Sequence, residues 1–296
     1  MSTPENAPPP SAVPPEGPPP ELDDANDLRG HHFKLLLGRT LTWVLLLGAA
    51  LLGGVVGAAF LHPLLGAAIA AGVVLIGLGI VFAIADSRAA DAFFTAYAAE
   101  RGLELGGRAP LPPVTPLMRK GDDRYAERTL SGPIGEGIEA ILALYTYEEE
   151  SRDSKGNKQT NYYRYTVCLV NVPECQAHIT ELYAQRKFGF RALEGFEDVF
   201  RRKKERVKLE SEVLDERYEI FATKSQDPVW LRRLFSPTFI VWLTDSAPQK
   251  FAFELVDGNL CCYVSGHKEN SAELDGIAAA TTAVARRLRE EAAETS

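Results

Sequence analysis

The sequence has little cysteine: Cys168, Cys175, Cys261 and Cys262 are the only four among 296 residues. A secreted domain that depends on disulfides would carry more cysteines, at framework spacings. On a strand, the adjacent Cys261 and Cys262 would point to opposite faces and would be poor partners for each other. The scarcity argues against a disulfide scaffold and indicates a reducing compartment.

Residues 41–85 lack every charged side chain. We predict two transmembrane helices, Leu41–Leu61 and Leu64–Ala85, that turn back on each other at His62-Pro63. Each would rise about 31–33 Å, which matches a hydrocarbon core of about 30 Å. One continuous helix would measure about 68 Å, far more than the bilayer. A buried helical pair in a soluble protein is the alternative, and so long an uncharged stretch disfavours it.

Lysine and arginine are missing from the turn between these spans and present on both flanks. Arg29, Lys34 and Arg39 precede the first span, and Arg88 and Arg101 follow the second. Cytoplasmic loops of membrane proteins carry the excess of such residues. We therefore expect both termini in the cytoplasm.

Small residues recur in the first span at four-residue spacing, at Ala49, Gly53 and Gly57. Such residues let helix backbones approach closely. The face serves either the packing of the two helices within one hairpin, which we favour, or a homo-oligomer interface.

The first 28 residues lack any base and nearly every large apolar side chain. They contain six acids, Glu5, Glu16, Glu21, Asp23, Asp24 and Asp27. Runs such as Pro8–Pro10 and Pro18–Pro20 favour an extended, polyproline-like chain that cannot build a core. We expect a disordered spacer, or a ligand for a proline-recognising groove. Residues 29–88 would then hold the juxtamembrane segment and the hairpin, and residues 89–296 a soluble domain.

The soluble part begins with a helical pattern over Asp86–Leu103 and a proline-rich linker over Arg108–Pro116. From Arg124 the pattern is mostly of period two, which is typical of strands. Alternating segments on both sides of the polar stretch Glu148–Asn161 predict a long β-hairpin with a mobile tip at Lys155-Gly156-Asn157. Further strands are expected at Val207–Leu209, Arg217–Thr223, Phe251–Val256 and Leu260–Val264, the last two joined by the turn Asp257-Gly258-Asn259.

Helices are also predicted in this part. Asp227-Pro228 and Ser236-Pro237 each combine a capping residue with proline at the first helical position. The C-terminal segment Ser271–Ala293 carries one apolar face, made of Leu274, Ile277, Thr281, Val284 and Leu288. The fold class is therefore membrane-anchored α+β, with a transmembrane hairpin followed by a cytoplasmic domain of mostly antiparallel sheet and flanking helices.

Three stretches resemble a bacterial family known as domain of unknown function 3137. They are Ala140–Tyr147 with Tyr162–Val170, Leu209–Glu212 through Tyr218–Phe221, and Asp227–Leu243 followed by Phe253–Tyr263. The resemblance covers most of residues 90–265 and implies a transmembrane hairpin in the bacterial inner membrane with a cytoplasmic α+β domain. It supplies no catalytic residue, because the family has no established activity.

Motifs for phosphate loops, zinc helices, nucleophile elbows and dinucleotide binding are missing. The nearest metal candidate is Cys168, Cys175 and His178, whose spacing is unlike known zinc pairs, so a buried, inert role is favoured. We expect no cofactor. The sequence favours a non-enzymatic binding or scaffolding domain at the membrane. The alternative is an enzyme acting on a lipid or membrane-bound substrate, with a site assembled from distant residues.

Two surface features are candidates for binding. The strongest basic cluster consists of Arg201, Arg202, Lys203, Lys204, Arg206 and Lys208. We favour a solvated strand-and-turn edge for it, and contact with anionic lipid is the functional alternative. The acidic remainder of the domain counts against nucleic acid. The aromatic group Tyr145, Tyr147, Tyr162, Tyr163 and Tyr165 could line a ligand site, but cross-strand aromatic pairs also stabilise hairpins, and we favour that role. A protein partner at the cytoplasmic face is also expected.

Overall fold

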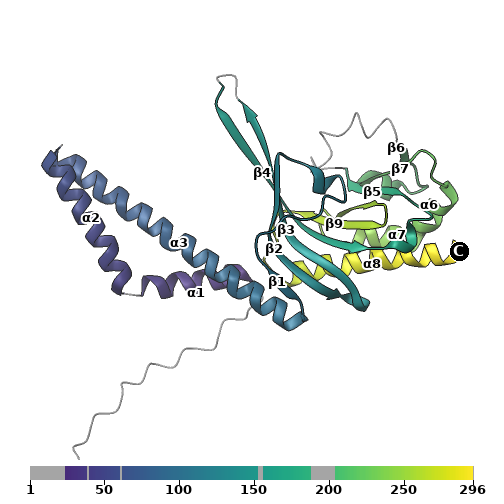
Figure 1. The fold of residues 1–296 in the computed structure, drawn as a ribbon, viewed down its shortest axis with the longest axis horizontal. Coiled ribbons are helices and arrows are strands. Elements are labelled where there is room, and N and C mark those ends of the chain that lie inside the picture. Colours follow the sequence, from purple (N-terminus) through teal and green to yellow (C-terminus); the bar gives the residue numbers. More distant parts are fainter. Residues whose placement is uncertain (1–23, 39, 61, 153–155, 188–203, 296) are drawn as a thin grey trace, which may run out of the picture. The chain divides into compact units, whose positions relative to one another are not determined.

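The computed structural model describes residues 24–38, 40–60, 62–152, 156–187 and 204–295. The chain divides into two compact units, Met1–Asp86 and Ser87–Ser296. Figure 1 shows the helices of the first unit and, in the second unit, a large sheet with helices. Residues 1–23 of the predicted tail lie outside the described residues.

The first unit contains helix α1 (Ala25–Leu37), α2 (Thr40–Phe60) and the beginning of α3 (Pro63–Arg101). Two of these helices, α2 and α3, are long and apolar enough to cross a membrane. They separate at His62-Pro63 as predicted, where the amide N–H of Leu64 donates to Nδ1 of His62 at 3.3 Å. Proline fits the start of α3 because its missing N–H would have no partner in the first turn.

Two helix boundaries differ from the predictions. Helix α1 begins at Ala25, so the last residues of the predicted disordered tail, up to Leu28, are helical. No proline interrupts Ala25–Leu37, so nothing in this stretch prevents a helix. Helix α3 merges the second predicted span with the amphipathic segment and stops at Gly102, whose φ of 65° suits a glycine cap.

Helices α2 and α3 pack through glycines. A Cβ added to Gly57 would lie 3.0 Å from Cα of Gly66, and one added to Gly66 would lie 2.5 Å from the carbonyl oxygen of Gly54. Gly53 and Gly57 thus serve packing within the hairpin, as favoured, whereas Ala49 is exposed. A strict four-residue spacing drifts by about 40° a step around a helix of about 3.6 residues per turn. The buried α2 residue one turn before Gly53 and Gly54 is therefore Ala50 instead.

The second unit is built on one antiparallel sheet of nine strands in the order β1-β2-β3-β4-β9-β8-β5-β7-β6. The strands are β1 (Glu104–Gly106), β2 (Asp123–Ile134), β3 (Ile138–Arg152), β4 (Lys158–Asn171), β5 (Glu181–Arg186), β6 (Lys204–Val207), β7 (Tyr218–Thr223), β8 (Ala252–Val256) and β9 (Asn259–Ser265). The predicted antiparallel sheet with flanking helices is confirmed.

Helices cover one face of this sheet. They are α5 (Glu212–Arg217), α6 (Pro228–Leu234), α7 (Pro237–Val241) with a π-helical turn at Trp242–Ser246, and α8 (Ser271–Thr295). Helix α8 lies along the sheet (Figure 1) and buries the predicted apolar face, Leu274, Ile277, Thr281, Val284 and Leu288. The opposite face of the sheet carries Tyr145, Tyr165 and Tyr263, on which Leu117 and Met118 pack.

The local signals in the helical and turn segments are confirmed. Asp227 accepts a hydrogen bond from the amide of Val229 at 2.8 Å and caps α6, and Ser236 caps α7 in the same way. Asp257 and Gly258 have φ of 47° and 75°, so the β8–β9 turn uses two left-handed residues. The β3–β4 hairpin is also present and extends beyond the other strands (Figure 1).

Several strand predictions need correction. The polar stretch Glu148–Asn161, which was expected to lie between the two strands, is mostly paired strand, because Glu148 opposes Tyr162 and Arg152 opposes Lys158. Polar side chains are compatible with strands that face water on both sides. The strand expected at Val207–Leu209 lies earlier, as β6. Strands β1 and β5 and helix α5 were not predicted.

The glycine contact in the hairpin gives a matched pair of variants. We predict that Gly66→Ala destabilises the hairpin by about 1–3 kcal/mol, because its Cβ collides with backbone atoms that cannot move independently. Gly72→Ala in the same helix meets nothing within 4 Å and should be neutral or slightly stabilising. Unfolding of the detergent-solubilised protein by SDS, followed by circular dichroism, measures both. Equal stability of the two variants would contradict the observed packing.

Candidate functional site

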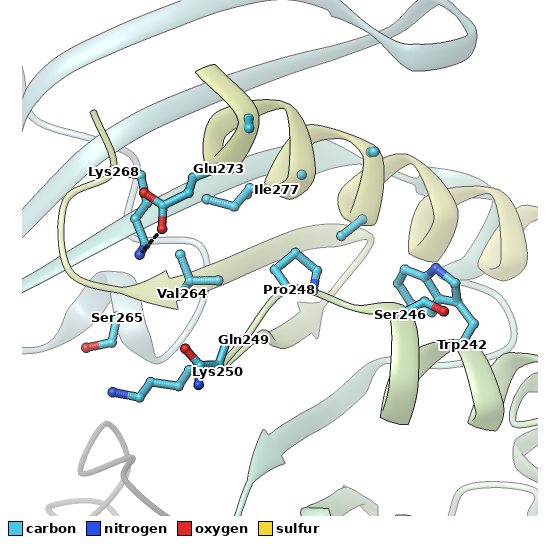
Figure 2. Close-up of a pocket in the computed structure, with 14 residues that line it drawn as sticks. Trp242, Ser246, Pro248, Gln249, Lys250, Val264, Ser265, Lys268, Glu273 and Ile277 are labelled. Atoms are coloured by element: carbon cyan, nitrogen blue, oxygen red, sulfur yellow. Dashed lines mark hydrogen bonds and ion pairs between the residues drawn. The ribbon is translucent and has the colours of Figure 1, made fainter. Parts of the chain in front are cut away.

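Two cavities follow one another along α8 and share Trp242. The first, of about 550 Å³, is bounded by α8, the end of β9 and the loop 246–250 (Figure 2). The second, of about 380 Å³, lies between α7 and the C-terminal half of α8. We call the two together the α8 groove.

The floor of the groove is a second, small-residue face of α8. Its members are Ala272, Gly276, Ala279, Ala280 and Ala283. Because alanine and glycine have short side chains or none, the helix surface is low here and leaves room beside it. The nearest atom to a Cβ added at Gly276 is Cγ of Pro248, at 3.9 Å. The helix therefore packs its large apolar residues against the sheet, with Ile277 at the border of the groove, and presents its small residues to the floor of the groove.

Trp242 forms the wall between the cavities. Phe239 stacks on its ring with centroids 5.5 Å apart, and Phe251 meets it edge-on at 6.2 Å. The indole is thus held in place while the side chain remains half-buried. It begins a π-helical turn, a rare element that recurs at functional sites. Figure 2 shows the indole at one end of the first cavity, beside α8.

A tight turn at residues 248–251 forms another wall of the first cavity. The amide of Phe251 donates to the carbonyl oxygen of Pro248 at 3.0 Å, which closes a turn through Gln249 and Lys250. Lys250 has φ of 60°, a left-handed conformation that glycine or asparagine adopts more easily. A lysine kept there costs about 1–2 kcal/mol of backbone strain. Its exposed side chain borders the first cavity.

Most of the cations around the groove are paired. Lys268 donates to Glu273 at 2.6 Å (Figure 2), while no acid among the described residues pairs with Lys250. Arg286, Arg287 and Glu290 line the second cavity. Arg286 lies 2.9 Å from Glu136 and Arg287 lies 3.0 Å from Glu291, so Lys250 is the cation of the groove without an acidic partner among the described residues.

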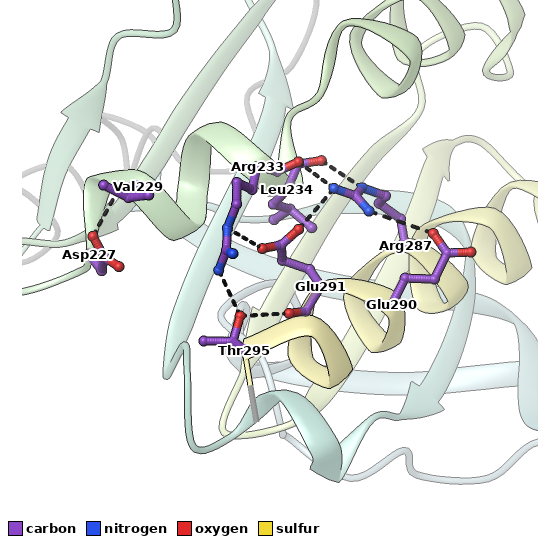
Figure 3. A network of polar contacts seen from close by, with 8 residues as sticks. All are labelled: Asp227, Val229, Arg233, Leu234, Arg287, Glu290, Glu291 and Thr295. Carbon is purple, nitrogen blue, oxygen red and sulfur yellow. Dashed lines mark hydrogen bonds and ion pairs between the residues drawn. The ribbon is translucent and has the colours of Figure 1, made fainter.

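A buried ion network fixes the far end of the groove (Figure 3). Glu291 of α8 is fully buried and lies 2.8 Å from Arg233 and 3.0 Å from Arg287. Arg287 also donates to the carbonyl oxygens of Arg233 and Leu234 at the end of α6. The last turns of α8 are therefore tied to α6, which keeps the second cavity in shape.

The ionisable side chains that line the groove are lysine, arginine and glutamate, and the carboxylates Glu273 and Glu290 lie beside cations. Elsewhere, burial raises the pKa of the Cys168 and Cys175 thiols to about 12, and it also raises the pKa of Cys261 and Cys262. These thiols stay protonated and are poor nucleophiles. Within the described residues, no three acidic, cysteine or histidine side chains are grouped as a metal site requires.

The predicted lipid-binding cluster is only partly described. Arg201, Arg202 and Lys203 lie outside the described residues. Lys204 is turned inward on β6, 2.8 Å from Glu181 and 2.7 Å from the hydroxyl of Tyr183, and burial lowers its pKa. Of the six, Arg206 lies 3.6 Å from Glu219 and Lys208 is exposed. Lys204 thus holds β5 and β6 together, and lipid contact by the remainder stays a prediction.

The predicted aromatic group divides between the two faces of the hairpin. The Tyr147 ring stacks on Tyr163 with centroids 4.8 Å apart and on Tyr165 at 5.9 Å. Tyr145 lies on the same face, whereas Tyr162 points the other way and is 52% exposed. The structural role that we favoured for this group is what the stacked rings support.

Glu254 is a buried carboxyl on the face of the sheet away from α8. It is 1% exposed, accepts from the amide of Leu117 at 3.0 Å and lies 3.4 Å from the hydroxyl of Tyr263. Burial raises the pKa of its carboxyl, although these hydrogen bonds and the nearby Lys120 oppose the shift. It holds the segment around Leu117 against the sheet.

The α8 groove was not predicted from the sequence, because only the large apolar residues of α8 were used for that prediction. A signal was available: Ala272, Gly276, Ala279 and Ala283 repeat at helical spacing opposite the large apolar face. That pattern indicates a second close approach, but not what approaches.

No protein-family model and no curated protein matches the chain, so its resemblance to domain of unknown function 3137 stays a prediction. A solved structure that is similar is the crystal structure of the mycobacterial trehalose monomycolate transport factor A, TtfA. It is 11% identical with a TM-score of 0.40, and the match covers 66% of this chain and 90% of that one. A likeness of this degree does not define a shared family or function.

The burial of Glu254 predicts that the stability of the folded protein depends on pH. Because its pKa is raised in the folded state, its stabilising contribution is complete below the unfolded pKa of about 4.3 and is lost as pH rises through the folded pKa. The glutamine in Glu254→Gln cannot ionise, so this variant does not lose stability at that position as the pH rises. Its thermal midpoint should therefore gain on the wild type as pH rises from about 4 to about 8, by about 2–4 °C for each kcal/mol recovered.

The exposed Glu216 provides the control. Glu216→Gln should leave the midpoint unchanged relative to the wild type across the same pH range. A Glu254→Gln variant that loses stability toward high pH relative to the wild type would show that the buried carboxylate is net stabilising when ionised.

Proposed function

We propose that this protein is a membrane-anchored binding protein. The hairpin of α2 and the first part of α3 spans the bilayer twice, and Ser87–Ser296 binds an extended polypeptide in the α8 groove on the cytoplasmic side. The half-buried Trp242 between two adjoining cavities carries this proposal.

The surface of the hairpin supports the anchor. A helix with α2's 21 residues rises about 31 Å, the thickness of the hydrocarbon core. Large side chains on both helices are exposed, among them Leu51 at 71%, Leu64 at 76% and Leu75 at 70%. An apolar helix in the core of a soluble protein would bury such residues, because their exposure to water costs about 1.5–3 kcal/mol each. Lipid is the solvent that suits them.

The lysine and arginine residues on both flanks of the hairpin support a cytoplasmic location for both termini. With the excess of lysine and arginine on the cytoplasmic side, reporter fusions at Met1 and at Ser296 should both show cytoplasmic activity. Periplasmic alkaline phosphatase activity from either fusion would contradict the proposed topology.

The chemistry of the groove supports a polypeptide ligand. Tryptophan beside small residues offers an apolar strip, and cations at the rim add polar contacts, as in grooves that bind extended peptides. The proposed contact of Arg206, Lys208 and their neighbours with anionic lipid is a separate, weaker interaction of about 1 kcal/mol per basic residue near the surface.

Site-specific photocross-linking tests the groove. A benzophenone amino acid replaces Gln249, which is exposed and lines the first cavity, in the full-length protein in native membranes. The control replaces Val229 of α6, which is 57% exposed and lines neither cavity. We expect a defined polypeptide adduct from position 249 and none from position 229. No adduct from position 249, or the same adducts from both, would contradict the proposed function.

A further inference from the structure

We propose that the β3–β4 hairpin binds an extended polypeptide as an added strand along the outer edge of β4. The partner is a segment that carries an acidic residue followed two positions later by an apolar one. None of residues 158–164, which form this edge, lines the α8 groove. The inference therefore adds a second binding surface and does not rest on the proposed function.

Strand β4 is longer than the neighbour that covers it. Its residues 165–171 pair with β9, whereas residues 158–164 pair with β3 alone. Among the described residues, no strand lies on their other side, and the hairpin extends beyond the other strands (Figure 1). At about 3.3 Å per residue, the uncovered side is about 23 Å long. We call it the open edge of β4.

The backbone of the open edge can accept and donate hydrogen bonds. The amide of Gly266 donates to the carbonyl oxygen of Arg164 at 2.8 Å, on the side where β9 ends. Successive residues of an antiparallel strand direct their N–H and C=O groups to alternate sides. Thr160 and Tyr162 therefore direct theirs to the same side as Arg164. These are the groups to which an added strand bonds.

The two outer edges of the hairpin differ. On β3, the amide of Asp122 donates to the carbonyl oxygen of Glu148 at 2.8 Å, and the carboxylate of Asp122 accepts from the amide of Glu150 at 2.9 Å. Asp122 thus closes the edge of β3. Residues 158–164 of β4 carry no proline and pair with β3 without a bulge, although both devices commonly protect an edge. The open edge is therefore suited to strand addition.

The charges of the open edge disfavour a second copy of this chain as the occupant. Asn161 is the middle of residues 158–164, so antiparallel pairing of two copies about this residue would place Lys158 of one opposite Arg164 of the other. Like charges directly opposite each other are destabilising. Lys158 already lies 2.5 Å from Glu150, whereas Arg164 has no acidic partner among the described residues. An acidic residue opposite Arg164 would supply that partner.

Tyr162 adds an apolar contact. Its side chain is exposed and lies on the same face as Arg164, whose guanidinium carbon is 5.8 Å from the centre of the ring. Residues two positions apart on an added strand also share one face. An acid opposite Arg164 and an apolar residue opposite Tyr162 are therefore two positions apart. On the other face, the stacked rings of Tyr147 and Tyr163 stiffen the hairpin before it binds.

The test uses a fluorescein-labelled peptide, Glu-Val-Phe-Thr-Val-Thr-Ser, and the full-length protein in detergent, with binding measured by fluorescence anisotropy. In antiparallel pairing, its glutamate meets Arg164, its phenylalanine meets Tyr162 and its second valine meets Thr160. We expect saturable binding. Methylation of the backbone nitrogens of the phenylalanine and the second valine keeps every side chain but removes two N–H donors, and should weaken binding by at least about tenfold.

Thr160→Pro and Thr160→Val are a matched pair of protein variants. Proline removes the N–H that points into the open edge, and it is tolerated there because this N–H does not pair with β3. We expect Thr160→Pro to abolish binding of the peptide. Valine keeps the N–H, so Thr160→Val should bind as the wild type does. Equal thermal midpoints show that neither variant has unfolded.

Charge reversal tests the choice of partner. Arg164→Glu should weaken binding by about tenfold, because it replaces an attraction with a repulsion. A peptide with lysine in place of its glutamate should restore the binding of this variant. Lys224→Glu makes a similar change at an exposed site outside the hairpin and should have no effect.

Binding that requires the N–H groups of the peptide and follows the exchange of charge supports the inference. The absence of saturable binding, or equal binding of the methylated peptide, overturns it. Binding that is lost in Trp242→Ala and kept in Thr160→Pro places the peptide in the α8 groove, which overturns this inference and leaves the proposed function standing. A wild-type dimer that Thr160→Pro converts to a monomer also overturns it, because a second copy then occupies the edge.

Discussion

The rest of the second unit depends on the position of α8. The contacts of Asp275 hold α8 in this position. This carboxylate accepts hydrogen bonds from Tyr97 at 2.8 Å and from Arg101 at 2.6 Å, in the last turns of α3. Burial works against ionisation of Asp275, but these donors outweigh it and hold its pKa below the ordinary value. The contact joins the end of α3 to the first turns of α8, while Phe93 and Phe94 are fully buried one to two turns earlier.

One helix thereby serves three surfaces. Large residues of α8, such as Ile277 and Leu288, fill the core above the sheet, Asp275 meets α3, and Gly276 and Ala280 form the floor of the groove. A shift of the helix by one residue would rotate it by about 100° and exchange these faces. The ion network of Glu291 with Arg233 and Arg287 secures the opposite end. The groove is therefore pre-formed, and a ligand need not order it.

Much of the architecture followed from short-range rules. The proline after Asp227 or Ser236, the left-handed turn at Asp257-Gly258 and the apolar face of α8 each depend on few residues close in sequence. Strand β5 escaped prediction because one of its faces is polar and charged, with Glu181 and Gln185 around Tyr183. Lys204 was assigned to the surface because its partner Glu181 is distant in sequence. The α8 groove required the same long-range knowledge, since Trp242, Pro248 and Ala279 meet only in the folded domain.

The central claim is that the hairpin anchors this domain in a membrane, and alkaline extraction of native membranes tests it most directly. The full-length protein should remain in the membrane pellet, because the exposed side chains of the hairpin, such as Leu51 and Leu75, would contact lipid in a spanning hairpin. Aspartate at both positions should move the protein to the supernatant, since a charge near the centre of a spanning helix costs about 2.5–3.5 kcal/mol. Release of the unchanged protein by alkali would contradict the account.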